Sequence, residues 1–76
     1  MIGSVALGIE RLINEKGFIQ GKIAAQSGFT AQQFSDMLNG RKIIRAEYLV
    51  PIAKALGVSV QDIYDAGLPK LANEAV

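Results

Sequence analysis

Residues 27–42 of the chain, SGFTAQQFSDMLNGRK, contain the clearest helix signal in the sequence. Thr30 is a favourable N-cap, and the side chain of Gln33, three residues later, can reach back to the Thr30 backbone amide in a capping box. Phe29, just before the cap, can pack on Phe34 as a hydrophobic staple. Because these three signals agree, we predict that a helix begins at Thr30.

The predicted helix ends at Asn39, since Asn39 and Gly40 form a typical helix stop. Its apolar positions share one stripe at helical spacing: Phe34, Met37 and Leu38. If that stripe faces inward, the opposite face carries Gln32, Asp36 and Asn39, with Gln33, Ser35 and Ala31 at its flanks. This outward face is polar but nearly uncharged, whereas a solvated helix surface usually carries lysine and glutamate.

Four further short helices are expected around this one, and no segment alternates with a period of two for long enough to predict a strand. The first runs from about Ser4 to Lys16, with Val5, Ile9, Leu12 and Ile13 on one face and Gly17 at its end. A second helix of about two turns contains Ile23 and Ala24 and is closed by Gly28.

After the central stretch, a helix with Leu49, Ile52, Ala53 and Leu56 facing inward is either kinked at Pro51 or begins near Tyr48. Gly57 ends it, and Ser59 then caps a last helix with an acidic first turn. We therefore expect an all-α, five-helix fold in a single domain covering residues 1–76.

The second and third predicted helices are joined by only three residues, SGF, in which Gly28 supplies the unusual backbone angle. This is the geometry of a helix-turn-helix, here spanning about residues 17–42. Short amides near the N-terminus of an exposed helix suit the base edges in a DNA major groove. Glutamine can pair bidentately with adenine, and the methyl group of Ala31 can meet a thymine methyl.

A candidate base contact can also have a purely structural interpretation. Gln33 serves equally well as the capping partner of Thr30, whereas Gln32 has no such local task, so we favour base contact for Gln32. Asp36 faces a polyanion, so it either accepts a hydrogen bond from a cytosine amino group or repels wrong sites. The candidate base-contacting residues are Ala31, Gln32, Gln33 and Asp36.

Cations gather around the same motif, although the net charge of the chain is only +1. Residues 16–45 hold five cations against one anion, while the remaining residues hold three cations against six acids. Arg41, Lys42 and Arg45, together with backbone N–H groups opened by Gly40, would form a phosphate clamp. The alternative is that Gly40 merely ends the helix and that the cations are ordinary surface charge.

Together these residues resemble the lambda-repressor/Cro-like helix-turn-helix proteins of phages and bacteria. The resemblance covers residue 17 to about residue 64. It rests on Gln20, Ile23, Ala24, Gly28, Thr30, the run Asn39-Gly40-Arg41-Lys42, and the closing segment IAKALGVSVQDIY. It implies double-stranded DNA as the partner, base contacts at Ala31, Gln32, Gln33 and Asp36, and phosphate contacts at Gln20, Asn39, Arg41 and Lys42. It also implies dimers on inverted repeats. Ile19 departs from the family's usual polar N-cap.

Composition disfavours an enzyme and a metal site. The chain has no cysteine and no histidine, which excludes disulfides and thiolate ligands and removes the commonest general base. Its seven carboxylates show no recognisable acid/base arrangement, so we expect no catalytic site and no cofactor. The apolar opening is interrupted by Glu10 and Arg11 far short of the roughly 20 residues that a membrane span needs. We therefore expect a cytoplasmic, nucleoid-associated protein.

The last part of the sequence is expected to mediate dimerisation. Ile63, Tyr64, Leu68 and Leu71 exceed what one terminal helix can easily bury, so the last helix and the tail, residues 68–76, could join two subunits. The alternative is that they cover the monomer's own core. A second function fits the same fold: a helical protein-interaction module without DNA binding, such as an antitoxin-like partner, using this apolar surface.

Overall fold

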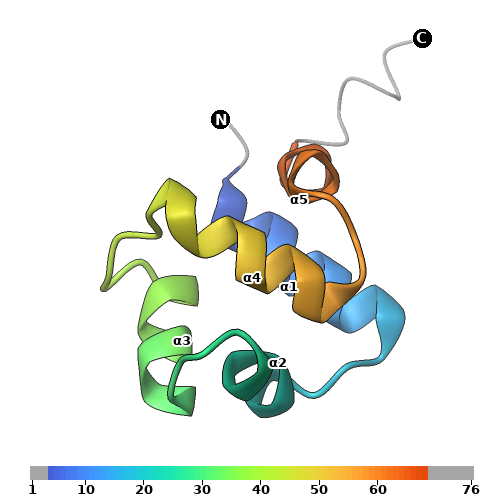
Figure 1. Ribbon diagram of the computed structural model, residues 1–76. Coiled ribbons are helices and arrows are strands. Elements are labelled where there is room, and N and C mark those ends of the chain that lie inside the picture. The colour runs from blue at the N-terminus through green and yellow to red at the C-terminus, as the bar shows by residue number, and fades with distance from the viewer. Residues whose placement is uncertain (1–3, 69–76) are drawn as a thin grey trace, which may run out of the picture.

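The computed structural model describes residues 4–68, and within this range the chain forms helices joined by short loops and no strand (Figure 1). The helices are α1 (Val5–Lys16), α2 (Gln20–Gln26), α3 (Ala31–Leu38), α4 (Ala46–Leu56) and α5 (Val60–Ala66). This confirms the expected all-α, five-helix architecture. Helix α3 begins directly after its predicted cap and is stopped by Asn39, as the sequence indicates.

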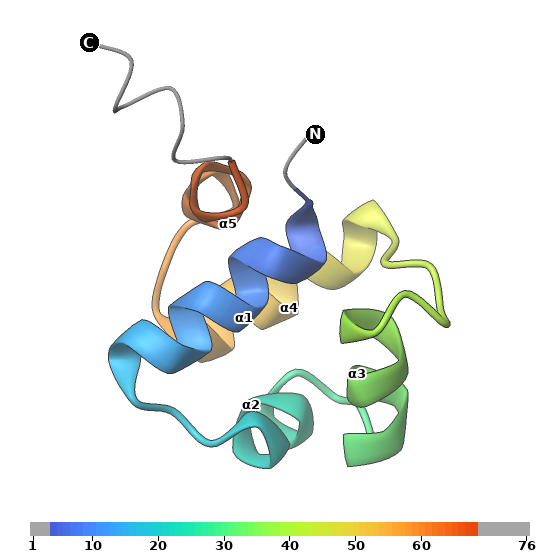
Figure 2. The same ribbon diagram turned by 180° about the vertical axis from the view of Figure 1, so that it is seen from behind.

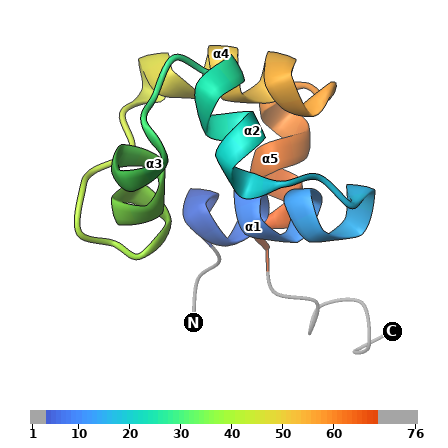
Figure 3. The same ribbon diagram turned by 90° about the horizontal axis from the view of Figure 1, so that it is seen from below.

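Helices α1 and α4 lie on opposite sides of the molecule, with the other three helices between them (Figure 3). The most extensive pairing is between α1 and α5, which are far apart in sequence; in Figure 2, α1 passes in front of α4, and α5 is seen end-on above it. The buried apolar side chains come from all five helices and form one core: Ile9, Leu12, Ile13, Ile23, Ala24, Phe34, Met37, Leu49, Ile52, Ala53, Leu56 and Ile63. The inward stripes predicted from helical spacing are therefore confirmed, with Val5 and Leu38 half-buried at their edges.

Helix α4 begins at Ala46 and runs unbroken through Pro51. The expectation that it begins near Tyr48 is wrong. Proline has no N–H, so the carbonyl of Glu47, four residues earlier, lacks its helical donor. Glu47 is exposed in the first turn, where water can satisfy that carbonyl. Tyr48 instead packs edge-on against Phe29, with ring centroids 5.1 Å apart.

The crossing of α1 and α5 depends on two glycines that carried no signal in the sequence analysis. A Cβ atom on Gly8 would lie 2.1 Å from the carbonyl oxygen of Ile63. A Cβ atom on Gly67 would lie 2.0 Å from the carbonyl oxygen of Ser4. Only glycine therefore lets these two backbones approach so closely.

Arg11 fastens the same crossing from its edge. Its guanidinium Nη1 donates to the carbonyl oxygens of Ala66 and Leu68, each at 2.9 Å. These carbonyls lie at and beyond the end of α5, where helical donors have run out, so the cation satisfies them. Arg11 is thus a structural residue that ties the last described turn to α1.

The start of α5 has the second capping box of the chain. The Ser59 hydroxyl accepts from the Asp62 N–H at 3.0 Å, and the Asp62 carboxylate accepts from the Ser59 N–H at 3.0 Å. The hydrogen bond from the Ser59 backbone, followed by that from its side chain, holds the pKa of Asp62 below its usual value. The predicted cap at Ser59 is confirmed.

The apolar residues expected to form a dimer surface separate into two groups. Ile63 is fully buried in the core of the single chain, so including it in an intermolecular surface was wrong. Tyr64 and Leu68, at 46% and 54% exposure, remain available. Tyr64 lies on α5, and Leu68 lies two residues after its end. Leu71 and the rest of the tail lie outside the described residues.

Candidate nucleic-acid interface

Helices α2 and α3 are joined by a tight turn in which Gly28 has a left-handed backbone, with φ of 88°. The N–H of Gly28 donates to the Ala25 carbonyl at 3.1 Å, and the N–H of Phe29 donates to the Ala24 carbonyl at 2.9 Å. Both bonds satisfy carbonyls at the end of α2, and a left-handed residue is what allows them. In Figure 1, α2 is seen nearly end-on while α3 runs vertically, as in a helix-turn-helix.

The predicted capping box fixes the start of α3. The Gln33 N–H donates to the Thr30 hydroxyl oxygen at 3.0 Å, and the Thr30 N–H donates to Gln33 Oε1 at 2.9 Å. Phe29 and Phe34 have ring centroids 6.4 Å apart, consistent with the predicted staple. The Gln33 amide oxygen is already engaged by the Thr30 N–H, so a bidentate contact with adenine would have to use its second lone pair or open the cap. Its amino group remains exposed.

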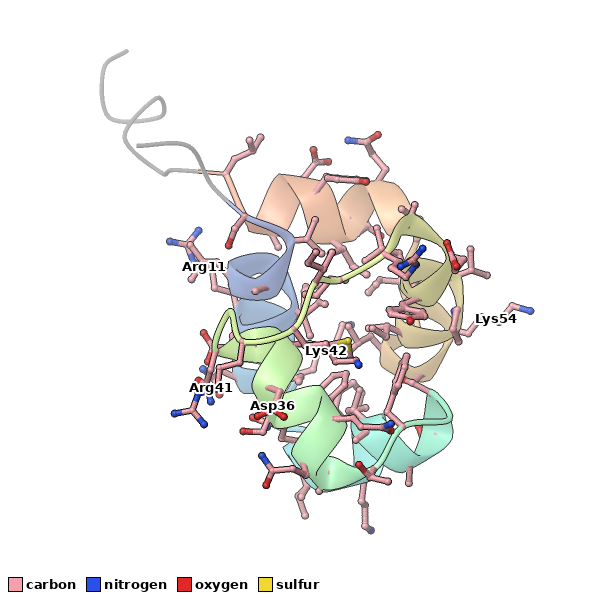
Figure 4. The ribbon with its side chains drawn as sticks, turned by 90° about the vertical axis from the view of Figure 1, so that its left-hand side faces the viewer. Arg11, Asp36, Arg41, Lys42 and Lys54 are labelled. Carbon is pink, nitrogen blue, oxygen red and sulfur yellow. The ribbon has the colours of Figure 1, made fainter. Side chains whose placement is uncertain are left out.

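Helix α3 buries one side and leaves the other open. Phe34 and Met37 are 0% and 1% exposed, whereas Ala31 and Gln32 are exposed and Asp36 is half-buried. Asp36 lies on the part of α3 that faces the viewer in Figure 4. The candidate base-contacting side of α3 is therefore accessible in the single chain.

Two of the candidate base-contacting residues touch each other. The Gln32 amide Nε2 donates to Asp36 Oδ1 at 2.9 Å, across one turn of α3. Sequence analysis treated the two residues separately, although their spacing of four residues is the signal that predicts such a pair. The carboxylate on this face is thus hydrogen-bonded to a neighbour.

The loop after α3 is held to the helix by backbone hydrogen bonds. The Gly40 N–H donates to the Met37 carbonyl at 3.3 Å, and the N–H groups of Arg41 and Lys42 donate to the Asp36 carbonyl at 2.8 and 3.2 Å. Gly40 has φ of 82°, which this closing turn requires. The expectation that Gly40 opens backbone N–H groups for a phosphate is wrong, because the N–H groups here are already bonded within the protein.

The side chains of the loop remain as candidate phosphate contacts. Arg41 and Lys42 are exposed, and both project from the segment that passes beside α3 (Figure 4). Arg45 forms an exposed ion pair with Glu47, its Nε lying 3.5 Å from the carboxylate. Contact between Arg45 and a phosphate would have to compete with this acid, so Arg41 and Lys42 are the stronger candidates.

Gln20 and Asn39 lie at the ends of the two motif helices. Gln20 is the exposed first residue of α2, and Ile19 before it provides no side-chain cap, as its apolar character indicated. Asn39 ends α3, and its Nδ2 donates to the Ser35 hydroxyl at 3.3 Å. Its amide oxygen has no part in that bond.

One further residue of this surface was missed by sequence analysis. Ile43 is 80% exposed, and it lies in the loop between the pair Arg41 and Lys42 and the N-cap residue Arg45. An apolar side chain set among cations and left in solvent was the available signal. Ile43 is therefore an additional candidate for apolar contact at this interface.

Within residues 4–68, no group of three or more acidic, histidine or cysteine residues could hold a metal ion. Among those same residues, no helix has the length and apolar character needed to cross a membrane.

A short turn with a left-handed glycine, an open polar helix and a cationic loop together define a helix-turn-helix protein, a class in which the second helix enters the major groove of DNA. The model of the helix-turn-helix family matches residues 9–63, well over half of the chain, and the chain belongs to this family. The resemblance to lambda-repressor/Cro-like proteins is thereby confirmed.

A curated relative shares the same region. The chain is 43% identical over 49 residues to an uncharacterized HTH-type transcriptional regulator, y4dJ, of Sinorhizobium fredii. The aligned region covers 64% of this chain and 64% of the relative. The relative is described as a transcriptional regulator, and the match spans less than two thirds of its length.

Proposed function

We propose that this protein is a small, repressor-like transcriptional regulator that binds double-stranded DNA at a specific sequence, with α3 in the major groove. The observation that carries the proposal is the open polar side of α3, directly beside the exposed Arg41 and Lys42 that are fastened to the same helix. Such an arrangement provides sequence-dependent contacts and phosphate contacts from one rigid unit. This role would be exercised in the cytoplasm, at the nucleoid.

The roles in this proposal follow from the side chains that are free to act. Base contacts come from Ala31, Gln32, the amino group of Gln33, and Asp36. Phosphate contacts come from the side chains of Gln20, Asn39, Arg41, Lys42 and Arg45. Gly40 contributes the turn that places Arg41 and Lys42, while its own N–H donates to the Met37 carbonyl rather than to a phosphate.

Selection of bound duplexes from a randomised pool tests this function. We expect enrichment of one sequence, and we expect Gln32→Ala to weaken binding to it by about 1–3 kcal/mol with relaxed preference at one base pair. Enrichment of no duplex at low salt would contradict the proposal. If no duplex were enriched, and if Gln32→Ala left binding to a protein partner unchanged, the function as a protein-interaction module would be favoured instead.

We further propose that two subunits bind an inverted repeat, joined through α5. Tyr64 and Leu68 are the exposed apolar residues on and after this helix. A dimer would place two copies of α3 about 34 Å apart, one turn of DNA. Light scattering at high concentration should give the mass of two chains. The mass should fall to that of one chain for Tyr64→Ser with Leu68→Ser.

Val50→Ser is the matched control for the dimer, because Val50 is 51% exposed but lies on α4. This variant should retain the dimeric mass. Two results together would contradict the dimer: a monomeric mass for the unaltered protein and a selected DNA sequence without two-fold symmetry. The proposed DNA binding would then still stand.

A further inference from the structure

The hydrogen bond between Gln32 and Asp36 determines which way the Gln32 amide faces. A carboxylate accepts hydrogen bonds and cannot donate them, so the amide must turn its nitrogen toward Asp36. The amide oxygen of Gln32 then lies away from the carboxylate. Asp36 therefore restricts the free amide to one of its two orientations before any ligand arrives.

We propose that Asp36 is a positioning residue for Gln32, and that the two form one recognition unit selective for bases with an exocyclic amino group in the major groove. In this unit adenine faces Gln32 and cytosine faces Asp36. The inference rests on the proposed DNA-binding function and specifies which base edges that surface accepts.

The groups left free on the pair support this choice. Gln32 retains its amide oxygen and one N–H, which together match the N6 amino group and N7 of adenine. Asp36 retains an oxygen that only accepts, which matches the N4 amino group of cytosine. At the corresponding edge, guanine presents its acceptors O6 and N7, and thymine presents its acceptor O4. These acceptors would face the Asp36 carboxylate with no proton between them to form a hydrogen bond.

A competing explanation is that the pair only stabilises its helix. The chain holds a matched case on α5, where Gln61 Nε2 donates to Asp65 Oδ1 at 3.0 Å across the same four-residue spacing. The side chains of the two pairs are exposed except for Asp36, which is half-buried, and only the pair on α3 lies on the candidate interface. Asp65→Asn therefore removes the same charge from the same kind of Gln–Asp pair, but away from the candidate interface, and it serves as the control.

The test uses the full-length protein and the duplex that it selects, with every single-base variant of that duplex measured by anisotropy. For Asp36→Asn we expect a cytosine preference of about tenfold at one base pair to fall below twofold, because an asparagine can turn its amino group outward. Asp65→Asn should leave all preferences unchanged. A uniform rise in affinity for every duplex with Asp36→Asn would overturn the inference, because it would show an effect of charge alone.

A double-mutant cycle tests the coupling directly. Gln32→Ala should weaken binding to the selected duplex about tenfold in the unaltered protein but less than threefold in the Asp36→Ala background. Independent, multiplying effects would overturn the positioning role, and so would a selected site with guanine or thymine at the two positions. In both cases the proposed function stands, whereas selection of no duplex would remove the proposed function itself.

Discussion

Replacing Gly67 with alanine is expected to destabilise the protein by about 3 kcal/mol or more. The new Cβ atom would lie 2.0 Å from the Ser4 carbonyl oxygen and 3.2 Å from the Gly8 nitrogen. Both neighbours are backbone atoms, so no change of rotamer relieves the contact, and α5 must move away from α1. The movement would loosen the packing around Ile63, which is fully buried at this crossing.

The size of this effect matters because a domain of this length has only about 4–11 kcal/mol of stability. Thermal unfolding followed by circular dichroism should show a melting temperature lower by more than about 12 °C, or no cooperative transition. Gly67 has φ of −85°, which alanine adopts freely, so the experiment isolates steric contact from backbone strain. A fall of only a few degrees would contradict the proposed tight crossing.

Two further substitutions sharpen this test. Gly8→Ala meets the Ile63 carbonyl oxygen at 2.1 Å and should act like Gly67→Ala. One displacement of α5 relieves both contacts. The double variant should therefore lose less stability than the two single variants lose together. Gly21→Ala is the control: its Cβ meets nothing within 4 Å, and alanine in α2 should stabilise the fold by about 0.5–1 kcal/mol.

The elements that sequence analysis predicted well are those specified by neighbouring residues. The capping box at Thr30 and the N-cap at Ser59 each involve residues three apart, and the turn at Gly28 depends on a single backbone angle. Such signals are local, so a sequence displays them directly. The inward stripe of α3 was predicted for the same reason.

The features that were missed depend on residues brought together by folding. Gly8 meets Gly67, and Arg11 meets the carbonyls after α5, only because α1 and α5 cross. The burial of Ile63 has the same origin. A glycine inside a helical pattern is a weak hint of close packing, but it does not name the partner.

At the candidate interface, local reasoning placed the side chains on the correct face of α3, but it did not predict the hydrogen bonds that they make. Gln32 and Asp36 were assigned to the open side of α3, and their mutual hydrogen bond followed from spacing that was not used. The N–H groups after Gly40 were expected to be free because the sequence alone does not show how the loop folds back on α3.

Removing both cations of this loop is expected to have the largest effect on function. In the proposed complex, Arg41 and Lys42 each make a charged hydrogen bond to a phosphate, worth about 1.5 kcal/mol. The double variant Arg41→Gln with Lys42→Gln should therefore bind its selected duplex about 100-fold more weakly. The slope of log affinity against log salt should become shallower by about 2, because about two fewer counterions are released.

The loss should be nearly equal for selected and unrelated duplexes, since phosphates carry no sequence information. Lys54→Gln is the matched control: Lys54 is also exposed, but it projects from α4 on the other side of the view in Figure 4. It should change affinity by less than about twofold at moderate salt, where charges more than about 10 Å from a phosphate are screened. Equal losses from Lys54→Gln and from the loop variant would mean that net charge alone governs binding, and the surface formed by α3 and its loop would no longer be supported as the DNA contact.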